Sequence, residues 1–376
     1  MSSEAPSQHP NNPPGSRSEN RKLLLVSLLT LLIAALIAFF ARDTATVSSF
    51  RRLFGSSTRT ARSVAPLSAS ASVAAAASAK AKFTSELESS SASMKTPVYF
   101  LSHGGPNVMY DVEHPAYRKL GEIGREITTK VKPRAVVVFS AHWQGGKDTI
   151  YVNTAEMTDL IYDFYGFPDH YYKETYPNVG SKEVAHKVLD LLKEAGIESK
   201  GVKRGLDHGV WASFKCGQLI PFQPSNQKRT PLNIPIVQVS LFDNEDPIQH
   251  YRLGQAVSRL REENILIIVS GMAVHNLRDL RYAWGNPRPL PYAVSFDEAL
   301  KEAVTSAPDE REQAMAALLK RPDARQAHPT FDHLLPIHIG AGAAGMDLGK
   351  RTWTYPEGSM SWSQFRFGDV GNASSL

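Results

Sequence analysis

Three histidines stand just after short apolar runs, and imidazole is the side chain best suited to bind a metal ion or to move protons near neutral pH. The runs and their histidines are residues 98–101 with His103, residues 135–139 with His142, and residues 265–269 with His275. A serine follows each run directly. Three protein ligands that leave other positions open are typical of a catalytic metal site. The pattern therefore predicts a centre that binds a metal ion, moves protons, or does both.

Short β-branched runs that are apolar on both sides are typical of buried strands in a parallel sheet. The carboxyl ends of such strands meet at one edge, where open α/β sheets bind their ligands. We therefore expect the three histidines to lie at a shared rim. The alternative is that each is an ordinary core or loop histidine bonded to its neighbours. The same placement on three runs favours the shared site.

Four further histidines lie in segments that could contribute to the same site. His208 lies in a turn-like sequence, and His328, His333 and His338 cluster further along the chain. By spacing alone the choice of three metal ligands stays open, because neither an HExxH motif nor a cysteine-based spacing occurs. Cys216 is the single cysteine, so any metal must be held by nitrogen and oxygen, and no disulfide framework is expected.

The net charge of +5 does not indicate a nucleic-acid partner, because most of it lies in the N-terminal segment. Between Lys22 and Phe83, seven lysines and arginines face a single acid, Asp43. The rest of the 376-residue chain is long enough for one large α/β domain.

The first ninety-odd residues do not have the composition of a globular domain. Residues 1–22 are rich in Ser, Pro and Asn and are expected to be a disordered leader. Residues 23–40 form an uncharged apolar run of about 27 Å as a helix, which predicts a single-pass membrane anchor. A cleaved organellar targeting segment is the alternative, because the following stretch is rich in Arg, Ser and Ala. Residues 41–94 are expected to be a low-complexity tether, followed by a catalytic domain over residues 95–376.

From residue 95 onward, strand-like and helix-like segments alternate. Helices are expected over residues 117–131, 181–195 and 310–320. Two more are expected, one from Asp246-Pro247 to about residue 261 and one from a capping box at residues 295–298 to about residue 306. A further strand is expected over residues 234–242. This alternation predicts a single α/β domain with a mostly parallel central sheet flanked by helices. The metal site is expected at the carboxyl ends of its strands.

Seven short motifs resemble, in order, those of one known enzyme family. They are LSHGGP (101–106), FSAHW (139–143), FYGFP (164–168), DHGVW (207–211), PIVQVS (235–240), SGMAVHNL (270–277) and HLLP (333–336). Together they resemble the DODA-type (4,5-DOPA) extradiol dioxygenases, which belong with the class III extradiol ring-cleavage enzymes such as the protocatechuate 4,5-dioxygenase catalytic subunit. The resemblance covers roughly residues 96–367 and leaves out the first ninety.

The resemblance implies a role for each histidine. His103, His142 and His333 would bind one divalent metal, and His275 would be the acid/base residue beside it, or a fourth ligand when no substrate is present. His208 would line the substrate pocket. We expect His328 to orient a loop rather than to act directly.

The implied reaction is extradiol cleavage of a catechol-type, DOPA-like aromatic by O2. Members of this subgroup are commonly described as zinc proteins, whereas the reaction requires a redox-active ion such as Fe2+, because Zn2+ has no redox chemistry. Two other functions stay open. One is a zinc hydrolase on the same site, and the other is a non-catalytic binding protein like the Memo proteins, against which the complete histidine set argues. The expected partners are the catechol, O2 and a membrane, and the oligomeric state stays unknown.

Overall fold

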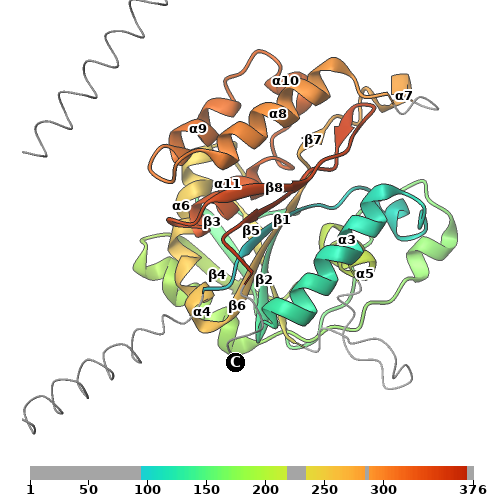
Figure 1. Ribbon diagram of the computed structural model, residues 1–376. Helices are drawn as coiled ribbons and strands as arrows, with labels where there is room; N and C mark the ends of the chain where they lie inside the picture. Colours follow the sequence, from blue (N-terminus) through green and yellow to red (C-terminus); the bar gives the residue numbers. More distant parts are fainter. Residues whose placement is uncertain (1–94, 218–233, 284–287, 371–376) are drawn as a thin grey trace, which may run out of the picture. The chain divides into compact units, whose positions relative to one another are not determined.

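An eight-stranded sheet forms the centre of the computed structural model, which describes residues 95–217, 234–283 and 288–370 (Figure 1). Its strand order is β4-β3-β5-β2-β6-β1-β11-β8. The strands are β1 (Val98–Ser102), β2 (Ala135–Gln144), β3 (Thr149–Asn153), β4 (Glu198–Val202), β5 (Ile236–Leu241), β6 (Ile265–Gly271), β8 (Gly349–Trp353) and β11 (Gln364–Phe367).

The four central strands, β5, β2, β6 and β1, are parallel to one another. They include the three apolar runs that precede His103, His142 and His275, so the predicted parallel sheet is confirmed. Towards the edges, β3 pairs with β5 in the antiparallel sense, as β11 does with β1 and β8 with β11. The sequence did not predict these antiparallel strands, because their short, mixed runs lack a continuous apolar pattern.

Alternate residues of each central strand pack into two separate cores, one on each face of the sheet. In β1, Val98 and Phe100 belong to one core, whereas Tyr99 and Leu101 belong to the other. Successive side chains of a strand point to opposite faces, so a strand covered on both sides must be apolar throughout. This explains why the runs read as continuous apolar segments.

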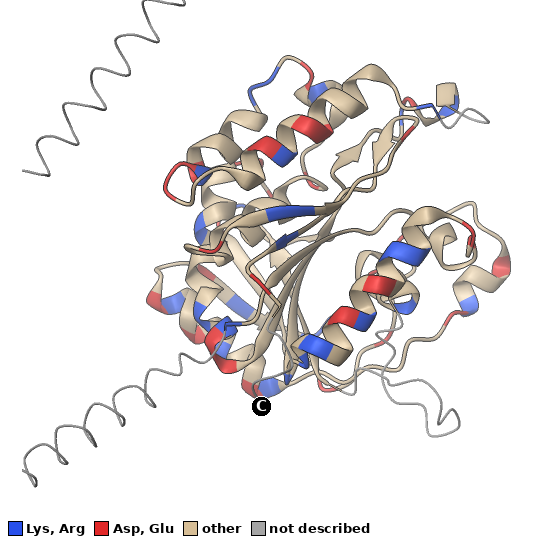
Figure 2. Cartoon of the chain, viewed as in Figure 1, with Lys and Arg blue, Asp and Glu red and all other residues tan. Residues whose placement is uncertain are grey.

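Helices cover both faces of the sheet. One core contains side chains from α4 (Lys182–Glu194), α6 (Pro247–Val257), α8 (Pro291–Thr305), α9 (Arg311–Leu318) and α11 (Leu335–Ala343). The other contains side chains from α3 (Pro115–Glu126) and α5 (His208–Cys216). The architecture is therefore three layers, α/β/α, as the fold class predicted. Most charged residues of the described region lie on the helices and loops, and the central strands carry few (Figure 2).

Two predicted helix starts are confirmed and one is wrong. The side chain of Ser181 caps α4, and that of Asp246 caps α6 by accepting from the backbone of residues 248 and 249. In contrast, α8 begins at Pro291, four residues before the predicted capping box. Proline at the first helical position is pre-set for a helix and leaves no donor unsatisfied, so the helix starts there. Ser295 instead donates a hydrogen bond to Asp323.

A second, smaller sheet lies beside the carboxyl end of β6. It has the order β7-β10-β9 and consists of the two-residue strands β7 (Val274–His275), β10 (Met360–Ser361) and β9 (Pro356–Glu357). Both pairings are antiparallel. The segment that follows β6 therefore leaves the main sheet and carries His275 into this small sheet.

The predicted single-pass membrane attachment is corrected by the structure. In the ranges described above, no helix combines the length and the hydropathy needed to cross a bilayer. Residues 23–40, on which the prediction depended, lie outside the described residues, as do the predicted leader and the predicted tether. We therefore no longer assign the membrane as a partner or as the location of this chain.

Candidate metal centre and active site

The strand registers bring the ends of three central strands to one level. Ser270 of β6 lies opposite Leu101 of β1 and opposite Ser140 of β2. His103 follows β1 directly, and His142 lies near the end of β2. These two imidazoles therefore reach the same rim of the sheet.

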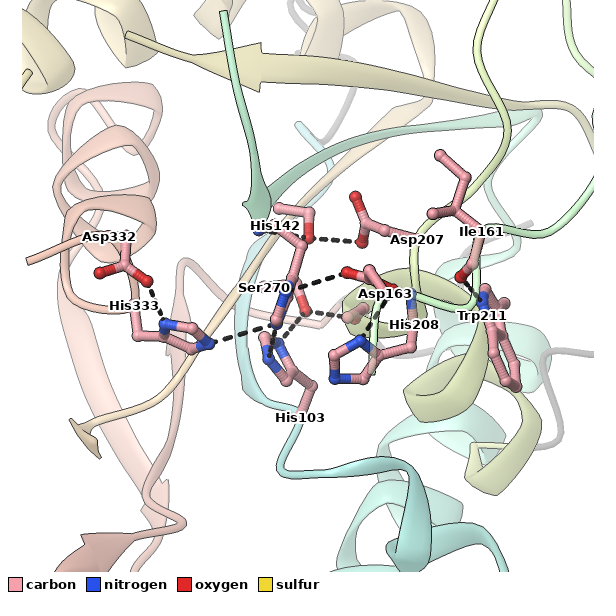
Figure 3. Close-up of polar contacts among 12 residues, drawn as sticks. His103, His142, Ile161, Asp163, Asp207, His208, Trp211, Ser270, Asp332 and His333 are labelled. Atoms are coloured by element: carbon pink, nitrogen blue, oxygen red, sulfur yellow. Dashed lines mark hydrogen bonds and ion pairs between the residues drawn. The ribbon is translucent and has the colours of Figure 1, made fainter. Parts of the chain in front are cut away.

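His333 joins them from the other side, just before α11 begins (Figure 3). The Nε2 atom of His142 lies 3.2 Å from Nε2 of His103 and 3.2 Å from Nε2 of His333. With metal–nitrogen bonds of about 2.1 Å, such a separation corresponds to an angle of roughly 100° at a shared ion. The spacing thus fits two adjacent ligands of a tetrahedral or octahedral ion.

The hydrogen bonds of His103 leave its Nε2 free to bind a metal. The Ser270 hydroxyl donates to the backbone oxygen of Gly209 at 2.6 Å, so its oxygen can only accept from His103 Nδ1, 2.9 Å away. The ring proton of a neutral His103 therefore sits on Nδ1. Its Nε2 lone pair faces the other two histidines.

Carboxylates hold the other two rings in the same way. His142 Nδ1 lies 3.0 Å from Asp163 Oδ2, and His333 Nδ1 lies 2.5 Å from Asp332 Oδ2. Metal-binding histidines commonly donate the second ring N–H to a carboxylate or hydroxyl, which fixes the tautomer and the ring orientation. His103 and His333 have this arrangement, and His142 forms an ion-pair contact with Asp163 through the same ring nitrogen.

His208 lies close to the same point. One ring nitrogen each from His103, His142 and His208 form a group within 4.8 Å of one another. Asp163 connects His208 to this group, because its Oδ1 accepts from both the backbone N–H and the Nδ1 of His208. Nε2 of His208 therefore also carries a free lone pair, and the structure offers two candidates, His208 and His333, for the third ligand.

Burial and charge set the protonation of these rings. Burial lowers the pKa of His103 well below 6.5 and also lowers the pKa of His333. For His142, burial acts in the same direction, but the nearby carboxylates Asp163, Asp207 and Asp332 together outweigh it and raise the pKa. Burial alone would raise the pKa of Asp163, but its contacts with His142 and His208 together lower the pKa well below its usual range. Asp163 is therefore an anion beside these two histidines.

Two glycines allow backbone to approach the centre. A Cβ atom on Gly209 would lie 2.8 Å from Ser140 Oγ, 2.9 Å from a carbon of the His142 ring and 3.1 Å from a carbon of the His103 ring. A Cβ atom on Gly271 would lie 2.2 Å from the backbone oxygen of His333. Any larger residue at either position would displace a histidine.

His275 stacks on His333, with ring centroids 3.7 Å apart and planes 15° from parallel. In the part of the chain that the structure describes, neither of its ring nitrogens has a hydrogen-bond partner. Burial, followed by the charge of His333, lowers its pKa well below 6.5. His275 is therefore a neutral, half-buried ring that faces the cleft.

Two other predicted histidines lie behind the centre. His328 is fully buried, and its Nε2 lies 3.0 Å from the backbone oxygen of Ala273, two residues before His275. His338 lies within α11 and donates to the backbone of Met315. The contact of His328 fits the expectation that it orients a loop.

Sequence reasoning missed the carboxylates that hold the rings. Asp332 is adjacent to His333, which could have suggested a pair. Asp163 lies in a loop between β3 and α4 without any periodic pattern, so only the fold reveals its contact with His142. Asp207, fully buried, accepts from Ser140 and Arg204 and so fixes the end of β2.

A cleft of about 740 Å³ opens in front of the histidines. Its wall is mainly aromatic and apolar, with contributions from Phe164, Tyr165, Phe167, Met272, Leu277, Leu280, Met360 and Trp362. His103, His142, His208, His275 and His333 all line it. The cleft is large enough for a substituted aromatic ring.

Together these features define an α/β protein with a histidine-rich site, of the kind that binds metal, at the carboxyl edge of a parallel sheet. The profile of a family described as "Catalytic LigB subunit of aromatic ring-opening dioxygenase" matches residues 96–364. The chain therefore belongs to the LigB family of extradiol ring-opening dioxygenases, and it is an extradiol dioxygenase.

Individual relatives agree with this family. The chain is 36% identical over 279 residues to "4,5-DOPA dioxygenase extradiol" of Beta vulgaris, which covers 72% of this chain and 95% of the relative. It is 32% identical over 254 residues to the protein of the same name from Escherichia coli, covering 67% and 86%. A solved structure of an uncharacterized Escherichia coli K12 protein aligns with a TM-score of 0.58 and 29% identity, covering 73% of this chain and all of that one. The family implies a divalent metal, and the cluster of histidines around His103 and His142 can hold one.

Proposed function

We propose that this chain opens the ring of a catechol with a DOPA-like side chain, using O2 and a ferrous ion held by His103, His142 and His333. The observation that carries the proposal is the position of His142 Nε2, 3.2 Å from Nε2 of His103 and 3.2 Å from Nε2 of His333. The Nδ1 atoms of these rings face Ser270 and two carboxylates. The name shared by the plant and bacterial relatives, 4,5-DOPA dioxygenase extradiol, supports the substrate class.

The choice of iron follows from the reaction. A ferrous ion held there would supply the redox chemistry that joins O2 to the catechol ring, which a zinc ion does not have. His103, His142 and His333 all line the cleft, so an ion held by them would be accessible to a catechol in that cleft. The low pKa values of His103 and His333 keep these rings neutral, as metal binding requires.

We assign proton transfer to His275. It lines the cleft next to His333, has free ring nitrogens and is neutral at pH 7, so it can take the proton of a catechol hydroxyl and return it to the opening ring. Its stacking on His333 holds the ring beside one of the proposed metal ligands.

His208 is assigned to the substrate wall rather than to the metal. The Nε2 atom of His333 lies 3.2 Å from that of His142, whereas the His208 ring packs edge-on against Phe164, with ring centroids 5.6 Å apart, on the aromatic side of the cleft. Its Nε2 can then bind a substrate oxygen.

Metal analysis of four single alanine variants tests these assignments. The protein is purified without oxygen and loaded with Fe2+, and oxygen uptake is recorded on a panel of catechols. We expect His103→Ala, His142→Ala and His333→Ala to lose the ion, and His208→Ala to keep it with a raised KM. If His208→Ala loses the ion and His333→Ala keeps it, His208 is the third ligand. A wild-type protein that binds only zinc and ignores every catechol would contradict the proposed reaction.

A further inference from the structure

One carboxylate of the cleft lies in register with His275 across the small sheet. Met360 of β10 is paired with His275 of β7 on one side and with Glu357 of β9 on the other. Directly opposite residues of antiparallel strands project to the same face. His275, Met360 and Glu357 therefore form a row on one face, and all three line the cleft.

The pairing of the three short strands sets the distance between His275 and Glu357. Neighbouring strands lie about 4.8 Å apart, so the backbones of His275 and Glu357 are about 10 Å apart, with Met360 between them. A catechol whose diol lies at the metal centre would rest its ring against Met360. Its side chain would then point towards Glu357.

Among the described residues, the polar partners of the Glu357 carboxylate are His114 and Trp362, and neither a lysine nor an arginine pairs with it. The His114 ring accepts the backbone N–H of Ala116 at Nδ1, so a neutral ring carries its proton on Nε2 and donates it to Glu357 at 3.0 Å. Trp362 donates to the same carboxylate oxygen, Oε2, at 3.3 Å. The bond from His114 lowers the pKa of Glu357, so the group is ionised at pH 7. Within the part of the chain that the structure describes, no side chain bonds to the other carboxylate oxygen, Oε1, which can therefore accept from a ligand.

The rest of the wall offers no competing cation. Among the described residues that line the cleft there is neither a lysine nor an arginine. The only other carboxylate there, Asp163, is engaged by His142 and His208. A substrate carboxylate would thus find no positive partner at this end of the cleft, whereas a substrate ammonium group would find Glu357.

We infer that Glu357 determines specificity by binding a cationic group, such as an ammonium, on the side chain of the catechol. This inference rests on the proposed function only for the placement of the diol. Charge-assisted hydrogen bonds to a partly shielded carboxylate contribute more than neutral ones and act through binding rather than through the chemical step.

Equilibrium binding to the full chain tests the inference without requiring turnover. Anaerobic calorimetric titrations compare dopamine with 4-ethylcatechol, which has the same carbon skeleton but no charge, and with 3,4-dihydroxyphenylpropionate, which is anionic. We expect the wild type to bind dopamine at least about tenfold more tightly than 4-ethylcatechol, and the anion most weakly. Glu357→Gln keeps an acceptor for His114 and Trp362, and it should bring the dopamine to 4-ethylcatechol ratio close to one.

The matched control is Glu113→Gln, which removes the same charge from an exposed carboxylate paired with Arg118 outside the cleft. It should retain the wild-type ratio. A wild type that does not prefer dopamine, or a preference that survives in Glu357→Gln, would overturn the inference and leave the ring-opening activity untouched. A preference that depends on Glu357 in a protein that opens no catechol would instead contradict the proposed function alone.

Discussion

At the level of single residues, His103, His142 and His333 are the proposed metal ligands, and His275 is the proposed proton-transfer residue. His275 stacks on His333 and has no polar partner among the described residues, whereas each proposed ligand has a polar partner at Nδ1. The two roles should therefore respond differently to substitution.

His275→Gln keeps a polar side chain that cannot exchange a proton near pH 7. We expect it to retain most of the metal and to lose on the order of a hundredfold or more in kcat. Parallel metal analysis and oxygen-uptake kinetics measure both quantities, with His142→Ala as the reference for metal loss. Metal loss as complete as in that reference would make His275 a ligand, and a change in kcat of only a few-fold would remove it from the mechanism.

Ser270→Ala removes the acceptor that fixes the His103 tautomer. Loss of such an outer hydrogen bond typically weakens metal binding by about 10–100-fold. We expect this change in the Kd for Fe2+ or for Zn2+, measured by competition with a chelator. Ser240→Ala is the control, because Ser240 is also a buried strand serine but accepts from the Tyr151 backbone. Equal affinities in the two variants would show that His103 needs no acceptor.

At the scale of elements, the site depends on how closely α5 approaches the ends of β1 and β2. Gly209 makes that approach, with neighbouring side-chain atoms 2.8–3.1 Å from where a Cβ would lie. Such contacts are shorter than packed side chains allow, so the helix or the histidine rings must move.

Gly209→Ala should therefore lower metal content and activity strongly while most of the fold persists. Gly121→Ala in α3 is the matched control, because its nearest neighbours would lie 3.6 Å away or more and alanine is favoured over glycine in a helix by about 1 kcal/mol. Thermal unfolding and metal analysis of both variants check this. A Gly209→Ala protein with full metal content would contradict the described approach of α5.

At the scale of the whole molecule, buried neutral histidines make the fold sensitive to acid. Burial lowers the pKa of His250 and of His338 to about 4, against about 6.5 in an unfolded chain. Between these values the unfolded chain binds protons that the folded chain does not. The free energy of unfolding should thus fall as the pH falls from about 6.5 towards 4, by up to about 1.4 kcal/mol per pH unit for each histidine.

His338→Gln removes one of these titrations and can still donate to the Met315 backbone. We expect a shallower loss of stability between pH 6.5 and 5, measured by urea unfolding at several pH values. His186→Gln, on an exposed histidine of α4, should leave the slope unchanged. An unchanged slope in His338→Gln would show that this histidine binds protons equally in the folded and the unfolded chain.

The parts of the fold that could be predicted from the sequence are those formed by continuous apolar runs. The runs before His103, His142 and His275 are apolar on both faces, and they became β1, β2 and β6. The two-residue strand that carries Glu357 is too short to leave a pattern, and the pairing of Asp163 with His142 joins loop and strand through tertiary contacts alone. The capping box at residues 295–298 was overridden by Pro291, which starts the helix earlier.

An experiment with isotopically labelled oxygen tests whether this chain opens the catechol ring with O2. The Fe2+-loaded chain is given a catechol under 18O2, and the product is analysed by mass spectrometry. The account predicts an open-chain product in which the ring bond next to the diol is broken and both atoms of one O2 molecule are incorporated. Oxygen uptake that yields a quinone without label, or a product that takes oxygen only from water, would contradict it.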